Sequence, residues 1–439
     1  MSRVRGGVNS TTIRISSKEN KGYKQFANFL FLFTKQAFEH SKDRISKDTV
    51  IFGEEDFVTN QYSSQFFAID FLKTAKSLGS AVYANTVAFG FISALFGINT
   101  DIAHNAIKNH FANTDVAQKN IDACNEGYKL FKDSPYIKIK PKVEQITPKK
   151  YALLSGSQAV AFGALSANAK FLSFYPMSPS TDVAIFLAHQ MDKFDIVVEQ
   201  FEDEIASVNA TIGAWFGGTR AFVTTSGGGY ALMEEGVSLA AMNVDTSHLE
   251  FIEPQNYIIQ TPTDYKRYEF TTTGVSKRGI PGFGSGIVVA NGNEHDEYGD
   301  ITEDEELTKL MLEKRMQKLN GIKSEALEPF YIGPETLKNL VVCYGFLYEN
   351  TKEALGLLDR NDTGLLSYSQ LYPLNDKGLD YLTKAQNLIF VEQNFSGQFA
   401  QLIWREYGIK ANRLINKYTG RQFFVEELKE LLQNALEVK

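Results

Sequence analysis

Two short polar stretches contain the residues of this sequence that could do chemistry. The first is the acidic run 202–204, Glu-Asp-Glu, which follows the apolar run "DIVVEQF" (195–201). The second is "TTSGGG" (224–229), which follows "RAFV". A carboxylate at a helix start either caps the helix or serves as a working acid. Ile, Ala, Ser and Val follow Glu204, which indicates a packed helix face, and a carboxylate buried there needs a partner such as a ligand nitrogen.

The elements around these stretches would bring them together. Strand-like and helical patterns alternate through this part of the chain, which predicts a parallel sheet. Ligands of such sheets bind outside the carboxyl ends of the strands. The stretches "YPMSPS" (175–180), "QFEDE" (200–204) and "TTSGGG" all follow strand-like runs. We therefore expect these three loops to line one pocket.

Three other motifs carry weaker signals. "DRNDTGLLSYSQ" (359–370) resembles a calcium loop, but Gln370 stands where a bidentate Glu is needed. "PGFGSG" (281–286) does not join a strand to a helix start, so a dinucleotide site is not indicated. "NEHDEYG" (293–299) places His295 among carboxylates and could hold a metal. Consecutive residues do not all face one way, which favours a solvated or interface loop instead.

Composition excludes several classes of protein. The chain has 439 residues, which allows about two to four domains. Its net charge of −7 argues against a nucleic-acid partner. The two cysteines, Cys124 and Cys343, are too few for a disulfide scaffold or a self-contained iron–sulfur cluster. The longest apolar runs are too short to cross a membrane, and the start has no signal-peptide pattern. These features predict a cytoplasmic protein without a membrane partner.

The order of the patterns predicts an α/β protein with three consecutive units, each built on a parallel sheet. The first unit is expected at 1–148 and the second at 149–270. A connector with a charged helix follows at 271–330, and the third unit spans 331–439. Strands of the first unit are expected at "STTIRIS" (10–16), "FANFLFLF" (26–33) and "DTVIFG" (48–53). The basic stretch 138–150 contains two prolines and is expected to be a linker.

These motifs resemble one known family over nearly the whole chain and in the right order. "SGSQAVAFGALSANAKFLSFYPMSPS", "EDEIASVNATIGA" and "RAFVTTSGGGYALMEEG" are similar to the alpha subunit of 2-oxoacid:ferredoxin oxidoreductases. The blocks "GIPGFGSGIVVANGNEHDEYGDI", "VEQNFSGQFAQLI" and "INKYTGRQF" are similar to its later parts. "SRVRGGVNSTTIRIS" and "ANTVAFGFISALFGI" resemble a gamma domain fused in front. The resemblance implies a gamma-like domain, a pyrimidine-binding domain and a transketolase C-terminal-like domain, in that order.

The resemblance also implies roles for particular residues. In this family a glutamate binds N1′ of the aminopyrimidine ring of thiamine diphosphate, and Glu204 takes that catalytic and cofactor-binding position. The family pattern Tyr-Pro-Ile-Thr-Pro has Met177 and Ser178 in place of Ile and Thr. Two further groups of residues are assigned roles by their positions in the family pattern. The substrate side would be lined by Tyr175, Pro176, Ser178, Pro179 and Ser180, and the cofactor would also contact Thr225, Ser226 and Gly227.

The family resemblance implies a thiamine-dependent enzyme that works with partners. It would convert a 2-oxoacid, such as 2-oxoglutarate or pyruvate, and coenzyme A to acyl-CoA and CO2, with electrons passing to ferredoxin. No Gly-Asp-Gly diphosphate loop occurs in the sequence. A partner beta subunit is therefore expected to supply that loop, Mg²⁺ and a [4Fe-4S] cluster. The site would be shared between the two subunits, and this chain alone is not expected to be active.

Two departures from the family pattern keep alternatives open. The gamma-like part is expected to lack the family's first strand and helix, because Met1 directly precedes "SRVRGG". A long segment that contains an Arg-Gly-Gly-Pro-Ser stretch is expected to be missing after about residue 244. The chain could therefore be a non-catalytic, shortened relative that keeps the fold and the beta-subunit interface. A transketolase-like subunit is a third interpretation, although the gamma-like front end argues against it.

Overall fold

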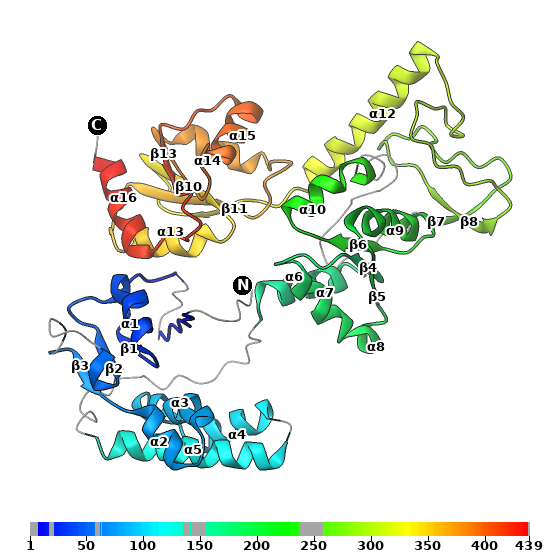
Figure 1. Cartoon of the computed structure of the whole chain (residues 1–439). Helices are drawn as coiled ribbons and strands as arrows, with labels where there is room; N and C mark the ends of the chain where they lie inside the picture. The colour runs from blue at the N-terminus through cyan, green and yellow to red at the C-terminus, as the bar shows by residue number, and fades with distance from the viewer. Residues whose placement is uncertain are drawn as a thin grey trace. The chain divides into compact units, whose positions relative to one another are not determined.

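The computed structural model in Figure 1 describes residues 8–16, 22–57, 62, 64–111, 113–134, 141, 154–237 and 258–437. The chain divides into two compact units. Unit 1 comprises residues 1–4, 150–329 and 370–378, and unit 2 comprises residues 5–149, 330–369 and 379–439. Apart from residue 141, the linker predicted at 138–150 lies outside the described residues.

The described residues 8–134, called here the front domain, contain a small parallel sheet in the order β1-β2-β3. The prediction for 26–33 and 48–53 is confirmed, because β1 and β2 lie within these runs. The prediction of a strand at 10–16 is wrong, since these residues form no strand. The residues of this segment are exposed, and the Arg14 side chain extends to a glutamate of the C-terminal part. The strands are β1 (Phe29–Phe31), β2 (Val50–Gly53) and β3 (Phe66–Ala68), and helix α1 (Lys35–Ser41) connects the first two.

A layer of helices covers the side of this small sheet opposite to α1 (Figure 1). Asn99 and Asn113 accept hydrogen bonds from backbone amides in the first turns of α4 and α5, as expected for helix caps. Helices α3 and α5 approach closely at Gly90 and Gly127, where a Cβ would lie 2.0 Å from a backbone carbonyl oxygen. The helices are α2 (Phe71–Ser77), α3 (Ala84–Leu95), α4 (Thr100–His110) and α5 (Thr114–Lys132), with short 3-10 turns at Lys42–Arg44, Glu55–Phe57 and Ala81–Tyr83.

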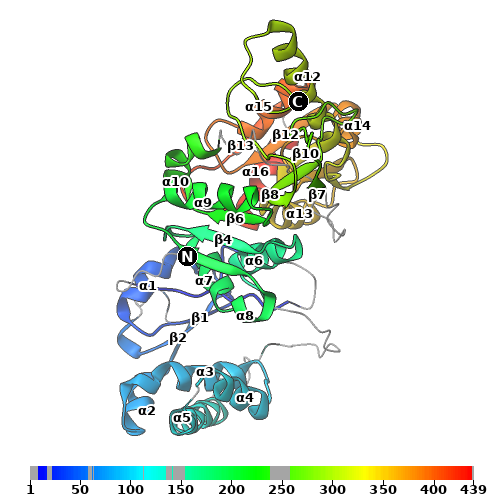
Figure 2. The ribbon, with the colours of Figure 1, turned by 90° about the vertical axis from the view of Figure 1, so that its right-hand side faces the viewer.

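The first part of unit 1 is a three-stranded parallel sheet in the order β5-β4-β6. Helices α9 and α10 lie on one side of it and α6 and α7 on the other (Figures 1 and 2). Leu172 of the central strand is fully buried in a core that also contains Ala184 and Leu187. The elements are α6 (Gly156–Ser166), β4 (Phe171–Phe174), α7 (Thr181–Ala188), α8 (Met191–Phe194), β5 (Val197–Gln200), α9 (Glu204–Phe216), β6 (Ala221–Thr224) and α10 (Gly227–Leu232).

The described residues 258–329 of unit 1 contain a two-stranded pair and one long helix. The glycine-rich stretch 281–286 lies mainly in a strand, where a Cβ at Gly284 would lie 2.3 Å from the backbone nitrogen of Thr261. This tight packing accounts for the glycine at position 284, and no bound nucleotide is needed to explain it. The charged helix expected in this part of the chain is confirmed. The elements are β7 (Ile258–Thr261), β8 (Arg278–Gly284) and α12 (Glu305–Ser324).

The C-terminal part contains a five-stranded sheet in the order β13-β12-β10-β11-β9. The first four strands are parallel and β9 is antiparallel at the edge. The calcium-like stretch 359–370 contains strand β11, so it forms part of the sheet rather than an ion-binding loop. The elements are β9 (Phe330–Ile332), β10 (Asn339–Tyr344), α13 (Leu347–Gly356), β11 (Thr363–Tyr368), α14 (Lys377–Lys384), β12 (Asn387–Glu392), α15 (Gln398–Tyr407), β13 (Arg413–Asn416) and α16 (Val425–Glu437). The predicted α/β class with mainly parallel sheets is confirmed.

Candidate functional site

Three loops begin at the same edge of the sheet formed by β5, β4 and β6. The register aligns Phe174 with Gln200 on one side and with Thr224 on the other, so the three strands end together. The backbone amide of Phe201 also donates to the carbonyl of Phe174 at 2.9 Å, which extends the pairing past the strand end. As expected for parallel strands, the loops that start at residues 175, 201 and 225 share one edge.

The structure gives the three residues of the acidic run different environments. The Asp203 carboxylate accepts a hydrogen bond from the backbone amide of Ala206 at 2.7 Å and is the N-cap of α9. Glu202 is exposed to solvent. Glu204, the first residue of α9, is only 4% exposed. Capping therefore accounts for Asp203 alone, and Glu204 is the buried acid of the run.

Glu204 lies beside the loop that follows β6. A Cβ built on Gly229 would lie 2.8 Å from Glu204 Oε1 and 2.1 Å from Thr225 Oγ1, so the two side chains converge on that glycine. Within the described part of the chain, the buried atoms Glu204 Oε1, Thr224 Oγ1 and Thr225 Oγ1 have no hydrogen-bond partner. A buried polar atom without a partner costs free energy, so this edge fits a ligand that supplies hydrogen-bonding groups.

A ladder of hydroxyl groups fixes the start of α9 on the central strand. The Ser207 hydroxyl donates to the backbone carbonyl of Asp203 at 2.8 Å. The Ser173 hydroxyl of β4 donates to the backbone carbonyl of Ser207 at 2.6 Å and lies 2.5 Å from Thr211 Oγ1. These bonds hold the helix, and with it Glu204, in a defined position above the sheet.

The remaining predicted residues lie in the loops at this edge. Tyr175, Ser178 and Pro179 are exposed in the loop after β4. The Ser180 hydroxyl in the same loop donates to the carbonyl of Met177 at 2.8 Å. Ser226 precedes α10, and Gly227 is its first residue. Their roles as substrate or cofactor contacts stay predictions.

Sequence reasoning missed two residues of this site. Gly229 is buried against Glu204 and Thr225, although only its place in a run of three glycines marked it. Thr224 ends β6 and its hydroxyl is buried beside the predicted Thr225. The repeated Thr-Thr before the glycines was the available signal for Thr224.

The stretch 293–299 is a structural loop. His295 is 6% exposed, and its ring centroid lies 3.8 Å from that of Tyr268. Arg315 donates two hydrogen bonds to Glu294, which lower the pKa of that carboxyl group. Lys266 forms an ion pair with Glu297 at 2.8 Å. Among the residues that the structure describes, no group of three or more His, Cys, Asp or Glu side chains could hold a metal ion.

Family models match two parts of the sequence. One, described as "Pyruvate flavodoxin/ferredoxin oxidoreductase, thiamine diP-bdg", matches residues 162–245, which include the three strands and the buried carboxylate. The other, described as "Pyruvate ferredoxin/flavodoxin oxidoreductase", matches residues 1–130, which include most of the front domain. The fold and these matches define an oxidoreductase class.

Curated relatives narrow the class to one family. The sequence is 24% identical to 2-oxoacid:ferredoxin oxidoreductase 2, subunit alpha, of Aeropyrum pernix, over 80% of this chain and 72% of that protein. It is also 24% identical to the 2-oxoglutarate synthase subunit KorA of Archaeoglobus fulgidus, over 65% of this chain and 99% of that protein. The sequence is thus similar to alpha subunits of 2-oxoacid:ferredoxin oxidoreductases over most of its length.

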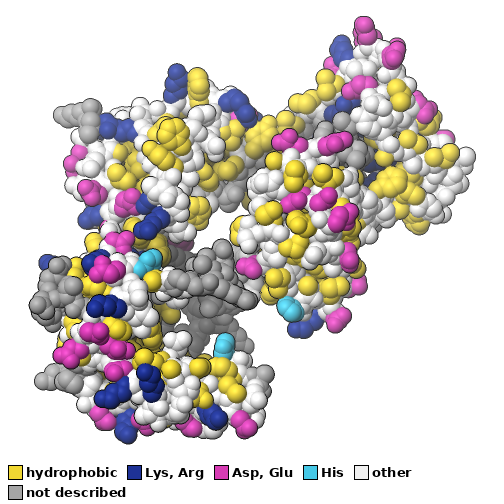
Figure 3. Space-filling view, in the orientation of Figure 1, with side chains coloured by type: hydrophobic (Ala, Val, Ile, Leu, Met, Phe, Trp, Pro, Cys, Tyr) yellow, Lys and Arg dark blue, Asp and Glu magenta, His cyan; other side chains and the backbone are white. Residues whose placement is uncertain are grey.

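A solved structure shows the same fold. The 2-oxoglutarate:ferredoxin oxidoreductase of Magnetococcus marinus aligns with a TM-score of 0.82 at 22% identity, over 95% of this chain and 90% of that one. Acidic and basic side chains are interspersed on the face shown in Figure 3 and form no single basic patch there. None of the helices that the structure describes has the length and apolar character needed to span a membrane.

Proposed function

We propose that the edge around Glu204 binds the aminopyrimidine ring of thiamine diphosphate, and that the chain is the alpha subunit of a 2-oxoacid:ferredoxin oxidoreductase. The reaction would be the oxidative decarboxylation of a 2-oxoacid with coenzyme A to acyl-CoA and CO2, with electrons passing to ferredoxin. One observation carries this proposal. Glu204 is buried where three loops meet, and its Oε1 has no partner in the described residues.

The residues at this edge fit the cofactor. Glu204 would hydrogen-bond N1′ and hold a proton there, and Thr225 has an unpartnered hydroxyl next to it. Gly229 contributes no side chain, so the backbone of α10 can lie close to the carboxylate. When bound, thiamine diphosphate would supply the electron sink for the loss of CO2. The protein's part is to orient the ring and to fix the position of the proton.

The substrate would bind beside the loop after β4. Tyr175 and Ser178 are exposed there and could contact a carboxylate or a carbonyl oxygen. The names of the relatives include 2-oxoacid and 2-oxoglutarate enzymes, which supports a 2-oxoacid as the substrate class. The solved structure of the M. marinus enzyme contains 2-oxoglutarate, coenzyme A and succinyl-CoA, which supports coenzyme A as the acyl acceptor.

A beta subunit would complete the site with the diphosphate loop, Mg²⁺ and a [4Fe-4S] cluster, and ferredoxin would accept the electrons in the cytoplasm. Relatives named as alpha subunits support the need for a partner. The two cysteines are both buried in this chain, and burial raises the pKa of each thiol to about 11. Buried thiols of that kind are poor metal ligands, which supports a cluster on the partner.

A second candidate is a non-catalytic relative that keeps the fold and the partner interface. It is favoured by the absence of an Arg-Gly-Gly-Pro-Ser stretch from the sequence, and the thiamine-related match ends at residue 245. Residues 238–257, where the missing segment was predicted, lie outside the described part of the chain.

The test compares Glu204→Gln with Glu202→Gln in the complex with the beta subunit. Loss of a general acid–base group lowers turnover of a 2-oxoacid by about 10²–10⁴-fold, whereas the exposed Glu202 control should keep the parental rate. Calorimetric titration with thiamine diphosphate and Mg²⁺ gives a second readout. Equal rates in the parent and Glu204→Gln would contradict the assignment. A parental complex that binds the cofactor but turns over no 2-oxoacid would favour the non-catalytic alternative.

A further inference from the structure

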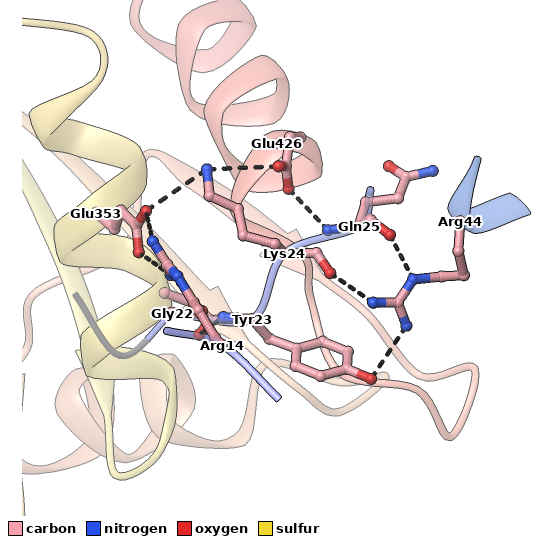
Figure 4. Close-up of polar contacts among 9 residues, drawn as sticks. Arg14, Gly22, Tyr23, Lys24, Gln25, Arg44, Glu353 and Glu426 are labelled. Atoms are coloured by element: carbon pink, nitrogen blue, oxygen red, sulfur yellow. Dashed lines mark hydrogen bonds and ion pairs between the residues drawn. The ribbon is translucent and has the colours of Figure 1, made fainter. Parts of the chain in front are cut away.

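Within unit 2, an ion-paired contact joins the start of the front domain to the C-terminal helices α13 and α16 (Figure 4). Arg14 donates two hydrogen bonds to the Glu353 carboxylate, each at 2.7 Å, and one to the carbonyl of Gly22 at 2.6 Å. Lys24 lies between Glu353 and Glu426, at 3.5 and 3.4 Å from their carboxylate oxygens. The front domain supplies the cations of this contact and the two helices supply the anions.

The backbone of the same segment is also bound. The amide of Tyr23 donates to Asn350 Oδ1 at 3.0 Å, and the amide of Val425 donates to the carbonyl of Tyr23 at 2.9 Å. The amide of Gln25 donates to Glu426 Oε2 at 3.0 Å. The backbone of Tyr23 is therefore held between α13 and the start of α16, and that of Gln25 is held at the start of α16.

Arg44, which belongs to the front domain, also binds this segment. It donates to the carbonyls of Gln25 and Lys24 and to the hydroxyl of Tyr23. The rings of Tyr23 and Phe424 stack with centroids 5.4 Å apart. The Arg44 guanidinium carbon lies 5.3 and 5.5 Å from these two ring centroids. A stacked guanidinium adds cation–π attraction across the contact.

The close fit of the front-domain residues on α13 and α16 depends on the glycine at position 22. A Cβ on Gly22 would lie 2.6 Å from both Glu353 Oε2 and Val425 Cγ2. The side chain of Glu353 is only 9% exposed, so Arg14 neutralises a largely buried charge. The arrangement is thus complementary in shape and charge, as in a specific docking site.

The buried apolar cores of the two joined parts are separate. One core lies among β2, α2, α3 and α5, and the other among β10, α13 and α16. No residue belongs to both clusters. Among the described residues, the connection comprises the contacts around Arg14, Tyr23 and Lys24 and an ion pair between Asp43 and Arg421 at 3.4 Å.

We propose that the face formed by α13 and α16 is a docking site for basic side chains and backbone of the front domain, and that its occupants are Arg14 and the residues 22–25. This docking, called here the clasp, makes the front and C-terminal parts one unit. The clasp comprises Arg14, Gly22–Gln25 and Arg44 on one side and Asn350, Glu353 and Phe424–Glu426 on the other.

Charge reversal in the full chain tests the clasp. Arg14→Glu places two like charges together and should open the clasp, and the double variant R14E/E353R should close it again. Hydrogen exchange at the backbone amides of Tyr23 and Gln25 reports whether the clasp is open or closed. Loss of charge-assisted bonds should speed their exchange about 10- to 100-fold, since each costs about 1.5–3 kcal/mol. Lys129→Glu, at an exposed position of α5, is the matched control.

Spin labels give an independent readout of the separation between the two parts. Lys108 and Glu430 are exposed and can be replaced by cysteine, while Cys124 and Cys343 are buried. If the clasp forms as proposed, the distribution of distances between the two spin labels should be narrow in the parent, broad in R14E and narrow again in R14E/E353R. An unchanged distribution in R14E would overturn the proposal. So would faster exchange in R14E throughout the front domain, because unfolding rather than undocking would then be the cause.

Discussion

A Cβ built on Gly229 would lie 2.8 Å from Oε1 of Glu204, so the third glycine of "TTSGGG" packs beside the buried carboxylate. This relationship connects the two stretches from which the sequence analysis began. It shows that the acidic run and the glycine run lie side by side, with Glu204 at the start of α9 and the backbone of α10 beside it. A side chain at residue 229 would occupy the space next to the acid.

Gly229→Ala should therefore damage the site. The added methyl group would overlap Thr225 Oγ1, 2.1 Å away, and displace Glu204. Overpacking of this kind typically costs about 1–3 kcal/mol of folding free energy. We expect lower affinity for thiamine diphosphate in calorimetry and a lower melting temperature. Gly228→Ala is the control, because nothing lies within 4 Å of its Cβ position. Parental cofactor affinity in Gly229→Ala would show that the glycine does not shape the site.

Asp203→Ala should reduce stability through the loss of a helix cap. The Asp203 carboxylate accepts the backbone amide of Ala206, and removal of such a cap costs about 1 kcal/mol. Chemical denaturation would measure this difference. Asp203→Asn retains a capping oxygen and should lose less. If Asp203→Ala were as stable as the parent, the cap would contribute nothing to α9.

Gly90→Ala should destabilise the front domain more than an ordinary helix substitution. Its Cβ would lie 2.0 Å from the backbone carbonyl oxygen of Cys124, so α3 and α5 would have to move apart. The cost should be about 1–3 kcal/mol or more, and thermal unfolding would report it. In contrast, Gly163→Ala in α6 has no atom within 4 Å of its Cβ, and alanine favours a helix by about 1 kcal/mol. Equal melting temperatures for the two variants would refute the close-packing argument.

Lys314 should make stability depend on pH in the alkaline range. Burial lowers the pKa of Lys314 to about 8, helped by the positive charges of Lys318, Arg267 and Arg315 and opposed by Glu297. Its ammonium donates to Ser276 Oγ at 2.7 Å. Between about pH 8 and 10.5 the unfolded chain then binds more protons than the folded one, so the folded state gains stability as the pH rises.

The substitution Lys314→Met should remove the part of the pH dependence of folding stability that comes from Lys314. At pH 7 the parent carries the full cost of a buried charge, about 3 kcal/mol from the shift, so the variant should be as stable as the parent or more stable. Its advantage should shrink as denaturation is repeated from pH 8 to pH 10. Lys309→Met, an exposed position on the same helix, is the control. An advantage that stayed constant over this range would show that Lys314 keeps its ordinary pKa.

Much of the fold was predictable from the sequence because local patterns determine it. Strand-like runs that alternate with helical patterns correctly marked β4, β5 and β6, and their order predicted a shared edge. The alternation in 10–16 failed as a strand signal. Ile13 and Ile15 are exposed, and Arg14 between them bonds Glu353, far away in the sequence. A contact over that separation leaves no local pattern to read.

The candidate site was predictable to the level of its loops but not of its contacts. Local sequence identified Glu204 as an acid on a packed helix face, and the structure separates it from Asp203, which caps α9. The role of Gly229 depends on how closely α10 approaches α9, which is a property of packing. Similarly, the role of His295 could be judged only once its close ring contact with Tyr268 was known.

The central claim is that Glu204 controls the proton at N1′ of thiamine diphosphate. The most direct measurement is the rate at which the C2 proton of the bound cofactor exchanges with deuterated water in the assembled complex. If Glu204 acts as proposed, Glu204→Gln should slow this exchange by about 10²–10⁴-fold, while Glu202→Gln leaves it unchanged. Exchange at the parental rate in Glu204→Gln, with the cofactor still bound, would contradict the account.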